Sequence, residues 1–279
     1  MLRLCVLSLG LVACGPDVLE PREPTPGVPH FKVATYNVFS EMEGDEPTLA
    51  TIGATGADVI CLQEVTPGWR ELIVARYSDQ YPYMLFKEHT GASGLGVISR
   101  YPLAGGDHLF FRQWHPAWQV SAETPAGWLQ LLVIHLRAKF DLRGYDNVLV
   151  SYTNWGTDHV LETQSFVQSG IEDAPTVILG DFNEGPEDDA VEYLESIGYD
   201  NALPLYHPGQ YTWRHASLGD QADDAIDHVL FNHYMAPLNA FVLVKGNSDH
   251  IPVVAHLEAN GTWPALGHAA SDSQALGGD

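Results

Sequence analysis

Short runs of apolar and β-branched residues recur along most of the chain, and several of them end in a polar residue. The clearest is TVILGDF (176–182), where the apolar run stops at Gly180 and Asp181 follows at once. Such compositions favour β-strands, and turn residues flank the runs. We therefore expect strands at 31–38, 58–65, 95–100, 117–123, 128–136, 176–182, 225–231 and 250–257.

Helical patterns lie between these runs, at 47–55, 68–78, 157–169 and 187–198. In the last of them Pro186 precedes acidic residues and Gly198 follows the end, as helix termini favour. Some expected strands alternate polar and apolar residues, whereas others are almost continuously apolar. This mixture predicts an α/β fold with two packed sheets and helices outside them, rather than one doubly wound sheet.

The length of 279 residues permits one or two domains, and nothing between residues 30 and 260 resembles a linker. We therefore expect one domain over residues 31–258. The C-terminal residues 259–279 are small, polar and aperiodic, so we expect them to be disordered. We expect the chain to act as a monomer.

The N-terminus has the pattern of an export signal. Arg3 precedes an apolar run from Leu4 to Ala13 that is too short to span a bilayer. The stretch LVAC, which ends at Cys14, resembles the lipobox of bacterial lipoproteins, in which the cysteine carries lipid. The alternative is an ordinary secretory signal over residues 1–14 in which Cys14 is incidental. The Pro-rich residues 15–30 then form an extended tether.

The net charge bears on the possible substrates, and the cysteine content bears on disulfide bonds. The net charge is −23, which repels nucleic acid at long range, because polyanion binding relies on clustered lysine and arginine. Cys61 would be the only cysteine of the mature domain, so it cannot form an internal disulfide, and we expect a buried thiol.

Polar residues at the expected strand ends are the strongest functional signal. A single such residue is usually a cap or a satisfied core group. Many of them at the ends of different strands can converge in one pocket, because the strand ends of a sheet lie near one another. The residues are Asn37, Glu64, His135, Asp181, Asn183, Asp227, His228, Asp249 and His250.

These residue types limit the chemistry. Carboxylates such as Glu64, Asp181 and Asp249 suit a hard cation, Mg²⁺ or Mn²⁺, that also binds a substrate phosphate. The asparagines can donate hydrogen bonds to a phosphoryl oxygen without adding charge. Histidines with an acidic partner, as in His250 with Asp227, can transfer protons near neutral pH. Together they predict metal-assisted hydrolysis of a phosphoester.

In this order and spacing, the motifs resemble those of the endonuclease/exonuclease/phosphatase superfamily over about residues 31 to 257. That superfamily includes deoxyribonucleases, abasic-site endonucleases, sphingomyelinases and inositol-polyphosphate phosphatases. The resemblance implies a four-layered α/β sandwich. The matching motifs are TYNV (35–38), LQEV (62–65), GVISRYP (96–102), VIHL (133–136), GDFN (180–183), YTWR (211–214), IDHVLF (226–231) and SDHIPV (248–253).

The resemblance also implies roles for individual residues. Glu64 looks like the main Mg²⁺ ligand, with Asn37 beside it in the metal and phosphate site. Asp181 would orient or activate the attacking water, and Asn183 would hold the scissile phosphate. Asp249 would help hold the metal or the histidine.

Two histidines complete this expected site. His250 would act as general base or transition-state stabiliser, oriented by Asp227, and the choice of base between His250 and Asp181 stays open. His135 matches the phosphate-contacting histidine of the deoxyribonuclease and phosphatase branches. The abasic-site branch has a tyrosine-containing motif in mid-domain, so VIHLRA (133–138) argues against that branch.

Three functions remain open at this point. Export favours a phosphodiesterase or phosphatase acting on a lipid head group or small molecule, with the aromatic stretch 108–119 either at an interface or in the core. An extracellular nuclease is the second, with the basic stretch RAKFDLR (137–143) as a polyanion cradle or a solvated loop. A non-catalytic surface protein is the third, but no expected site residue is missing. Residues 141–160 fall where relatives build substrate-recognition loops.

Overall fold

The computed structural model describes residues 18–112, 114–139, 148–214 and 224–264. It contains two mixed six-stranded sheets, each with one parallel pair of strands near its middle. The first sheet has the order β11-β12-β1-β2-β4-β3 and the second the order β5-β6-β7-β8-β10-β9. The α/β fold with two packed sheets is therefore confirmed.

The strands of the first sheet are β1 (His30–Asn37), β2 (Val59–Gln63), β3 (Tyr83–Lys87), β4 (Leu95–Ser99), β11 (Met235–Val242) and β12 (Val253–Ala259). Those of the second are β5 (Leu103–Phe110), β6 (Pro116–Thr124), β7 (Gly127–His135), β8 (Thr176–Asp181), β9 (Tyr199–Asn201) and β10 (Asp227–Asn232). The helices are α1 (Glu46–Ala54), α2 (Pro67–Tyr77), α3 (Val148–Gln168), α4 (Asp189–Ser196), α5 (Ala202–Tyr206) and the 3₁₀ turn η1 (Ser40–Met42).

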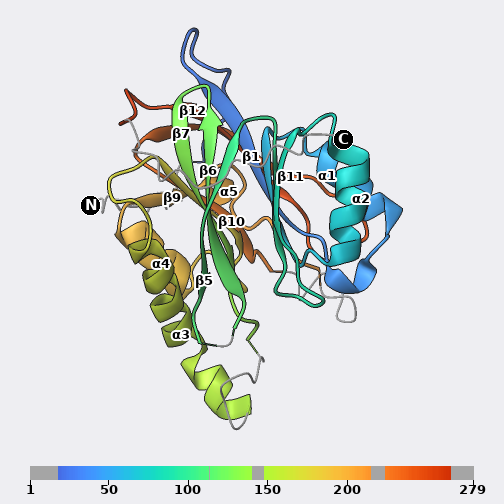
Figure 1. Cartoon of the computed structure of the whole chain (residues 1–279). Coiled ribbons are helices and arrows are strands. Elements are labelled where there is room, and N and C mark those ends of the chain that lie inside the picture. The colour runs from blue at the N-terminus through green and yellow to red at the C-terminus, as the bar shows by residue number, and fades with distance from the viewer. Residues whose placement is uncertain (1–17, 113, 140–147, 215–223, 265–279) are drawn as a thin grey trace, which may run out of the picture.

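The domain has four layers, which are the two sheets and the helices on the outer face of each. Three clusters of buried side chains pack these layers together, and strand β8 contributes to two of the clusters. Val177 and Leu179 point into the core between the two sheets, whereas Ile178 points outward to Phe166 of α3 and Leu194 of α4. This alternation follows from the two-residue period of a strand. Helices α1 and α2 cover the outer face of the first sheet in the same way (Figure 1).

The four strands that the sequence did not predict are the four sheet edges, β3, β5, β9 and β11. Two of these strands have interrupted patterns. β5 contains Gly105 and Gly106 at a register shift, and β11 contains Pro237 at another. Glycine and proline interrupt a strand pattern, and both are tolerated at edges, where a missing ladder bond matters less.

Two boundaries also differ from the sequence expectation. The strand expected from His250 begins only at Val253, because Pro252 has no N–H for the ladder and His250 makes an isolated bridge to Trp213 instead. Helix α3 begins at Val148, so much of the stretch expected as a recognition loop is helical. Residues 140–147 lie outside the described residues.

The N-terminal segment lies against the domain from Val18 onward, which differs from the expectation of a free tether. Arg22 Nη1 lies 2.7 Å from Glu258 Oε1, and the Thr25 backbone N–H donates to Glu258 Oε2 at 2.8 Å. The segment forms no strand ladder, and the buried carboxylate of Glu258 holds it against the domain through these polar contacts instead. The first residues of the expected disordered tail also pack, since Trp263 is buried and donates to Tyr234 O at 2.9 Å.

Candidate active site

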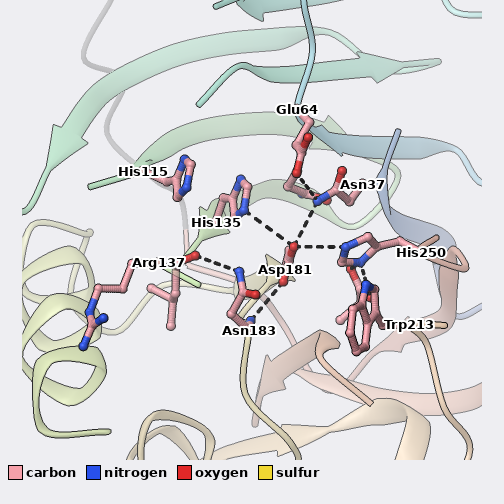
Figure 2. A network of polar contacts seen from close by, with 12 residues as sticks. Asn37, Glu64, His115, His135, Arg137, Asp181, Asn183, Trp213 and His250 are labelled. Atoms are coloured by element: carbon pink, nitrogen blue, oxygen red, sulfur yellow. Dashed lines mark hydrogen bonds and ion pairs between the residues drawn. The ribbon is translucent and has the colours of Figure 1, made fainter. Parts of the chain in front are cut away.

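The carboxylate of Asp181 is the centre of the polar network in Figure 2. Its Oδ2 accepts a hydrogen bond from Asn37 Nδ2 at 3.0 Å and lies 3.6 Å from His135 Nε2 and 3.5 Å from His250 Nε2. The side chain is buried. A charge in such surroundings requires donors, and nitrogen groups from three other segments surround it.

Strand register brings these residues together. Asp181 ends β8 and pairs with His135 at the end of parallel β7 and with Asp227 at the start of antiparallel β10. Gly180 has a φ of +151°, and a Cβ there would lie 1.8 Å from Ile134 O. Only glycine permits this close approach of β8 to β7 immediately before the central carboxylate.

His250 and Asp227 form a buried pair. His250 Nδ1 lies 2.9 Å from Asp227 Oδ2 and 3.1 Å from Oδ1. Burial lowers the pKa of His250, but the charges of Asp227 and Asp181 outweigh burial and raise that pKa to about 10. These two charges favour the protonated imidazole, whose Nε2 is turned towards Asp181.

Asn37 joins the centre to Glu64. Its Nδ2 donates to Glu64 Oε1 at 3.1 Å as well as to Asp181. The other oxygen of Glu64 accepts from Ser40 N at 2.9 Å and Ser40 Oγ at 2.7 Å. Glu64 itself has a φ of +61°, a costly backbone conformation for a residue with a side chain, and such strain concentrates at functional sites.

Asn183 reaches the site through a turn and not through strand alternation, because β8 ends at Asp181. Its backbone N–H donates to Asp181 Oδ1 at 2.9 Å, and its φ is +51°. Its Nδ2 donates to Leu136 O at 2.9 Å. The two residues are two positions apart in sequence but do not lie on one face of a strand; the Asp181 carboxylate closes an Asx turn that positions Asn183.

Asp249 lies at the edge of the network and is partly exposed. Its Oδ2 accepts from Trp213 Nε1 at 3.1 Å. Its Oδ1 is buried and has no hydrogen-bond partner among the described residues. A carboxylate oxygen in this situation suits a cation.

The sequence did not identify the residues that hold the network in place. Thr212 donates to Asp227 Oδ2 at 2.8 Å and accepts from the backbone of Ile226 and Asp227, each at 2.9 Å. Ser248 donates to Asn37 O at 2.8 Å and accepts from His250 N. Their only sequence signal was their place in the motifs YTWR and SDHIPV.

Two further histidines make contacts close to the strand ends. His115 was not expected and stacks on His135, with ring centroids 4.1 Å apart and planes 4° apart. His228, expected among the polar strand ends, belongs to a different set of contacts. Its ring nitrogens lie 2.8 Å from Glu184 O and 3.0 Å from Asn201 Nδ2.

The donor set fits a divalent cation. Among the described residues, one group of acids and histidines, Asp181, Asp227 and His250, has ligand atoms within 4.8 Å of one another. Asp227 and His250 already bind each other, and the carboxylates of Glu64, Asp181 and Asp249, which the sequence analysis expected at a metal, do not form a second group of this kind among the described residues. Oxygen ligands of this kind suit Mg²⁺ and Mn²⁺ alike.

The two-sheet sandwich carries a buried centre of acid, histidine and amide side chains where its strands end. The family model described as "Endonuclease/Exonuclease/phosphatase family" matches residues 34–250, so the chain belongs to this family. Its members are usually metal-dependent phosphoesterases or nucleases and generally use divalent metal ions. No relative is found among curated proteins.

Solved structures share the fold. An endonuclease/exonuclease/phosphatase from Beutenbergia cavernae DSM 12333 is 20% identical, with a TM-score of 0.65 over 84% of this chain and 72% of that one. The 3'-5' exonuclease NExo from Neisseria meningitidis is 18% identical, with a TM-score of 0.57 over 83% and 100%. An AP endonuclease from Archaeoglobus fulgidus is 17% identical, with a TM-score of 0.60 over 81% and 98%.

The hydroxyl of Thr212 should be needed for both stability and activity. Thr212→Val keeps the shape but leaves two buried N–H groups without their acceptor and removes one donor to Asp227, so we expect the free energy of unfolding to fall by about 2–3 kcal/mol. Urea denaturation measures this loss, and turnover should fall with it because Asp227 orients His250. Thr212→Ser keeps the hydroxyl and is the control. Equal stability of Thr212→Val and wild type would contradict this role.

Metal binding should stabilise the folded chain. Mg²⁺ or Mn²⁺ relieves repulsion between the site carboxylates, and a ligand at a hundred times its Kd adds about 2.7 kcal/mol. Thermal unfolding with metal and with EDTA should therefore differ in Tm. Glu64→Gln should remove most of that difference, whereas Glu71→Gln, at an exposed position of α2, should retain it. The same metal-induced shift in both variants would exclude Glu64 as a ligand.

Proposed function

We propose that the protein is an exported, metal-dependent phosphoesterase that acts on a lipid head group or another small phosphoester. The observation that carries the catalytic part is the convergence on Asp181 of Asn37, His135 and the His250–Asp227 pair. Acid, amide and histidine groups from separate strands can there act on one phosphate and one water.

Each residue has a task in this proposal. Asp181 orients and activates the attacking water. His250 stabilises negative charge that develops on the phosphoryl oxygens, and Asp227 orients its ring. His135 and Asn183 contact the scissile phosphate.

Metal chemistry supports these groups. A bound Mg²⁺ or Mn²⁺ would supply positive charge to polarise the phosphoryl group. Glu64 and Asp249 would hold it with their carboxylates. Asn37, whose amide Nδ2 donates to Glu64 and Asp181, fixes the spacing of the two carboxylates beside it.

Pairing of basic side chains supports a small substrate over a nucleic acid. Arg137, from the basic stretch considered as a polyanion cradle, is fully buried, and its Nη2 lies 3.3 Å from Asp158 Oδ2. Arg112 lies 3.2 Å from the other oxygen of Asp158, and Arg100 lies 2.8 Å from Asp58. These arginines are therefore committed to carboxylates within the chain.

A nuclease is the second candidate, and Arg214 favours it. Its backbone N–H donates to Asp249 O at 2.8 Å, which places it beside the site, and the described residues include no carboxylate within ion-pairing distance of it. Its guanidinium donates from Nη2 to Ser248 O at 3.4 Å, and its remaining N–H groups suit a phosphate of a nucleic-acid strand. A non-catalytic role is disfavoured, because no expected site residue is missing from the sequence.

Hydrolysis by matched variants tests the function. The full-length protein with Mg²⁺ or Mn²⁺ should hydrolyse bis(p-nitrophenyl) phosphate or a glycerophosphodiester. Asp181→Asn and His250→Ala should each lower turnover by about 10²–10⁴-fold, since each removes a group acting on protons or charge in the transition state. Circular dichroism should show that both variants stay folded. Near wild-type turnover in either variant would refute the assignment.

Supercoiled plasmid separates the two candidates. Nicking that requires metal and is lost in His250→Ala would establish the nuclease. Intact plasmid at high enzyme concentration, together with hydrolysis of the small diesters, would establish the small-substrate reaction. EDTA serves as the control in both assays.

Export through a lipidated Cys14 also belongs to this proposal. Residues 1–17 lie outside the described residues, and no helix in the described part of the chain is long and apolar enough to cross a membrane. We expect wild type in the membrane fraction of an expressing bacterium and Cys14→Ser in the soluble exported fraction. The same distribution for both proteins would contradict lipidation and favour an ordinary signal peptide.

A further inference from the structure

A pocket of about 400 Å³ lies next to the catalytic network without being part of it. It is lined by Lys87, Glu88, His89, Ser93, His108, Phe110 and Trp114. These residues come from the end of β3, the loop that follows it, β5 and the segment before β6. None of them has a task in the proposed reaction.

The β3–β4 loop connects this pocket to Glu64, the expected metal ligand. The backbone N–H of His89 donates to Val65 O at 3.1 Å, and the N–H of Val65 donates to Gly94 O at 3.1 Å. Val65 directly follows Glu64. The loop that lines the pocket is therefore anchored one residue from the expected metal ligand.

A second set of contacts connects the pocket to His135, the residue proposed to contact the scissile phosphate. Ser93 Oγ lies 3.0 Å from His115 Nδ1, and the His115 ring stacks on that of His135. Figure 2 shows His115 beside His135, on the side away from His250. A substrate whose phosphate contacts His135 thus has the pocket next to it.

The lining favours negative charge. Lys87 is exposed, lies over the Trp118 ring at 5.7 Å, and has no carboxylate within ion-pairing distance among the described residues. Glu88, the acid of the lining, lies 3.6 Å from Arg70. The Nε2 of His108 is buried and has no hydrogen-bond partner in the described part of the chain, so it is available to a ligand.

One wall of the pocket is rigid and aromatic. The ring of Trp114 lies between the guanidinium groups of Arg112 and Arg137, each 4.9 Å from its centroid. Arg137 is itself fixed by Asp158. Phe110, the exposed aromatic ring of the lining, can pack against a sugar, an inositol ring or a base, while Lys87 and His108 bind charged oxygens.

We propose that this pocket binds the part of the substrate beyond the scissile phosphate and selects an alcohol that carries a second negatively charged group, such as a second phosphate. The inference rests on the proposed function and names its substrate class. Lys87 attracts the second anion and repels a quaternary ammonium group, so choline esters are poor substrates. A phosphorylated polyol and a nucleotide share the favoured chemistry.

Substrate pairs that differ by one phosphate test this selectivity. One pair is glycerophosphoinositol and glycerophosphoinositol 4-phosphate, and the other is the dinucleotide TpT and its 5'-phosphorylated form pTpT. In at least one pair, the second phosphate should raise kcat/KM of the full-length metal-loaded protein about tenfold or more, the worth of a hydrogen bond to a charged group. Glycerophosphocholine should be hydrolysed more slowly than glycerophosphoinositol.

Variants identify the residue responsible. Lys87→Ala should reduce the preference for the phosphorylated member of the pair to near one, and Lys87→Glu should invert it. The change should appear mainly in KM. Lys32→Ala removes a lysine on β1 that does not line the pocket, and should keep the wild-type preference.

The outcomes separate this inference from the function on which it rests. Hydrolysis of bis(p-nitrophenyl) phosphate with no preference in either pair, or with the same preference in Lys87→Ala, overturns the pocket assignment alone. Absence of metal-dependent hydrolysis of every substrate overturns both. A preference in only the inositol pair or only the dinucleotide pair supports the pocket and decides which source of the second phosphate it accepts.

Discussion

The buried carboxylate of Asp181 is the constraint on which the site depends. A charge removed from water is costly unless hydrogen-bond donors surround it. Here Asn37 from β1, His135 from β7 and His250 from the loop before β12 supply nitrogen groups within 3.0 to 3.6 Å. These segments are distant in sequence, so the carboxylate is satisfied only when both sheets are complete and in register.

The sheet architecture meets that requirement through its two parallel pairs. β1–β2 and β7–β8 end at the same side of the sandwich, which brings Asn37 and Glu64 opposite His135 and Asp181. Antiparallel β10 then delivers Asp227 at the position paired with Asp181. Left-handed conformations at Glu64 and Asn183 turn the chain immediately after the strands, and hydrogen bonds from Ser40 and to Asp181 stabilise these turns.

The strands that the sequence predicted correctly are the buried central ones. Central strands such as β2 and β8 are buried on both faces, so their apolar runs are continuous and were recognised. The edge strands were missed: β5 contains two glycines, β11 contains a proline, and β3 and β9 are only five and three residues long. Within the site, Glu64, Asp181 and His250 were expected from the sequence. His115, Thr212, Ser40 and Ser248 were not, and a hydroxyl in particular has no distinctive pattern in sequence.

The sequence by itself determined the α/β class, the family motifs and the set of residues with catalytic chemistry, because residue type and local periodicity are written directly in the chain. Only the tertiary structure decided which of them meet. It closed an Asx turn at Asn183, stacked His115 on His135 and buried Arg137 on Asp158. It also formed the pocket around Lys87. Such contacts depend on strand register and loop closure between distant segments, which local pattern does not encode.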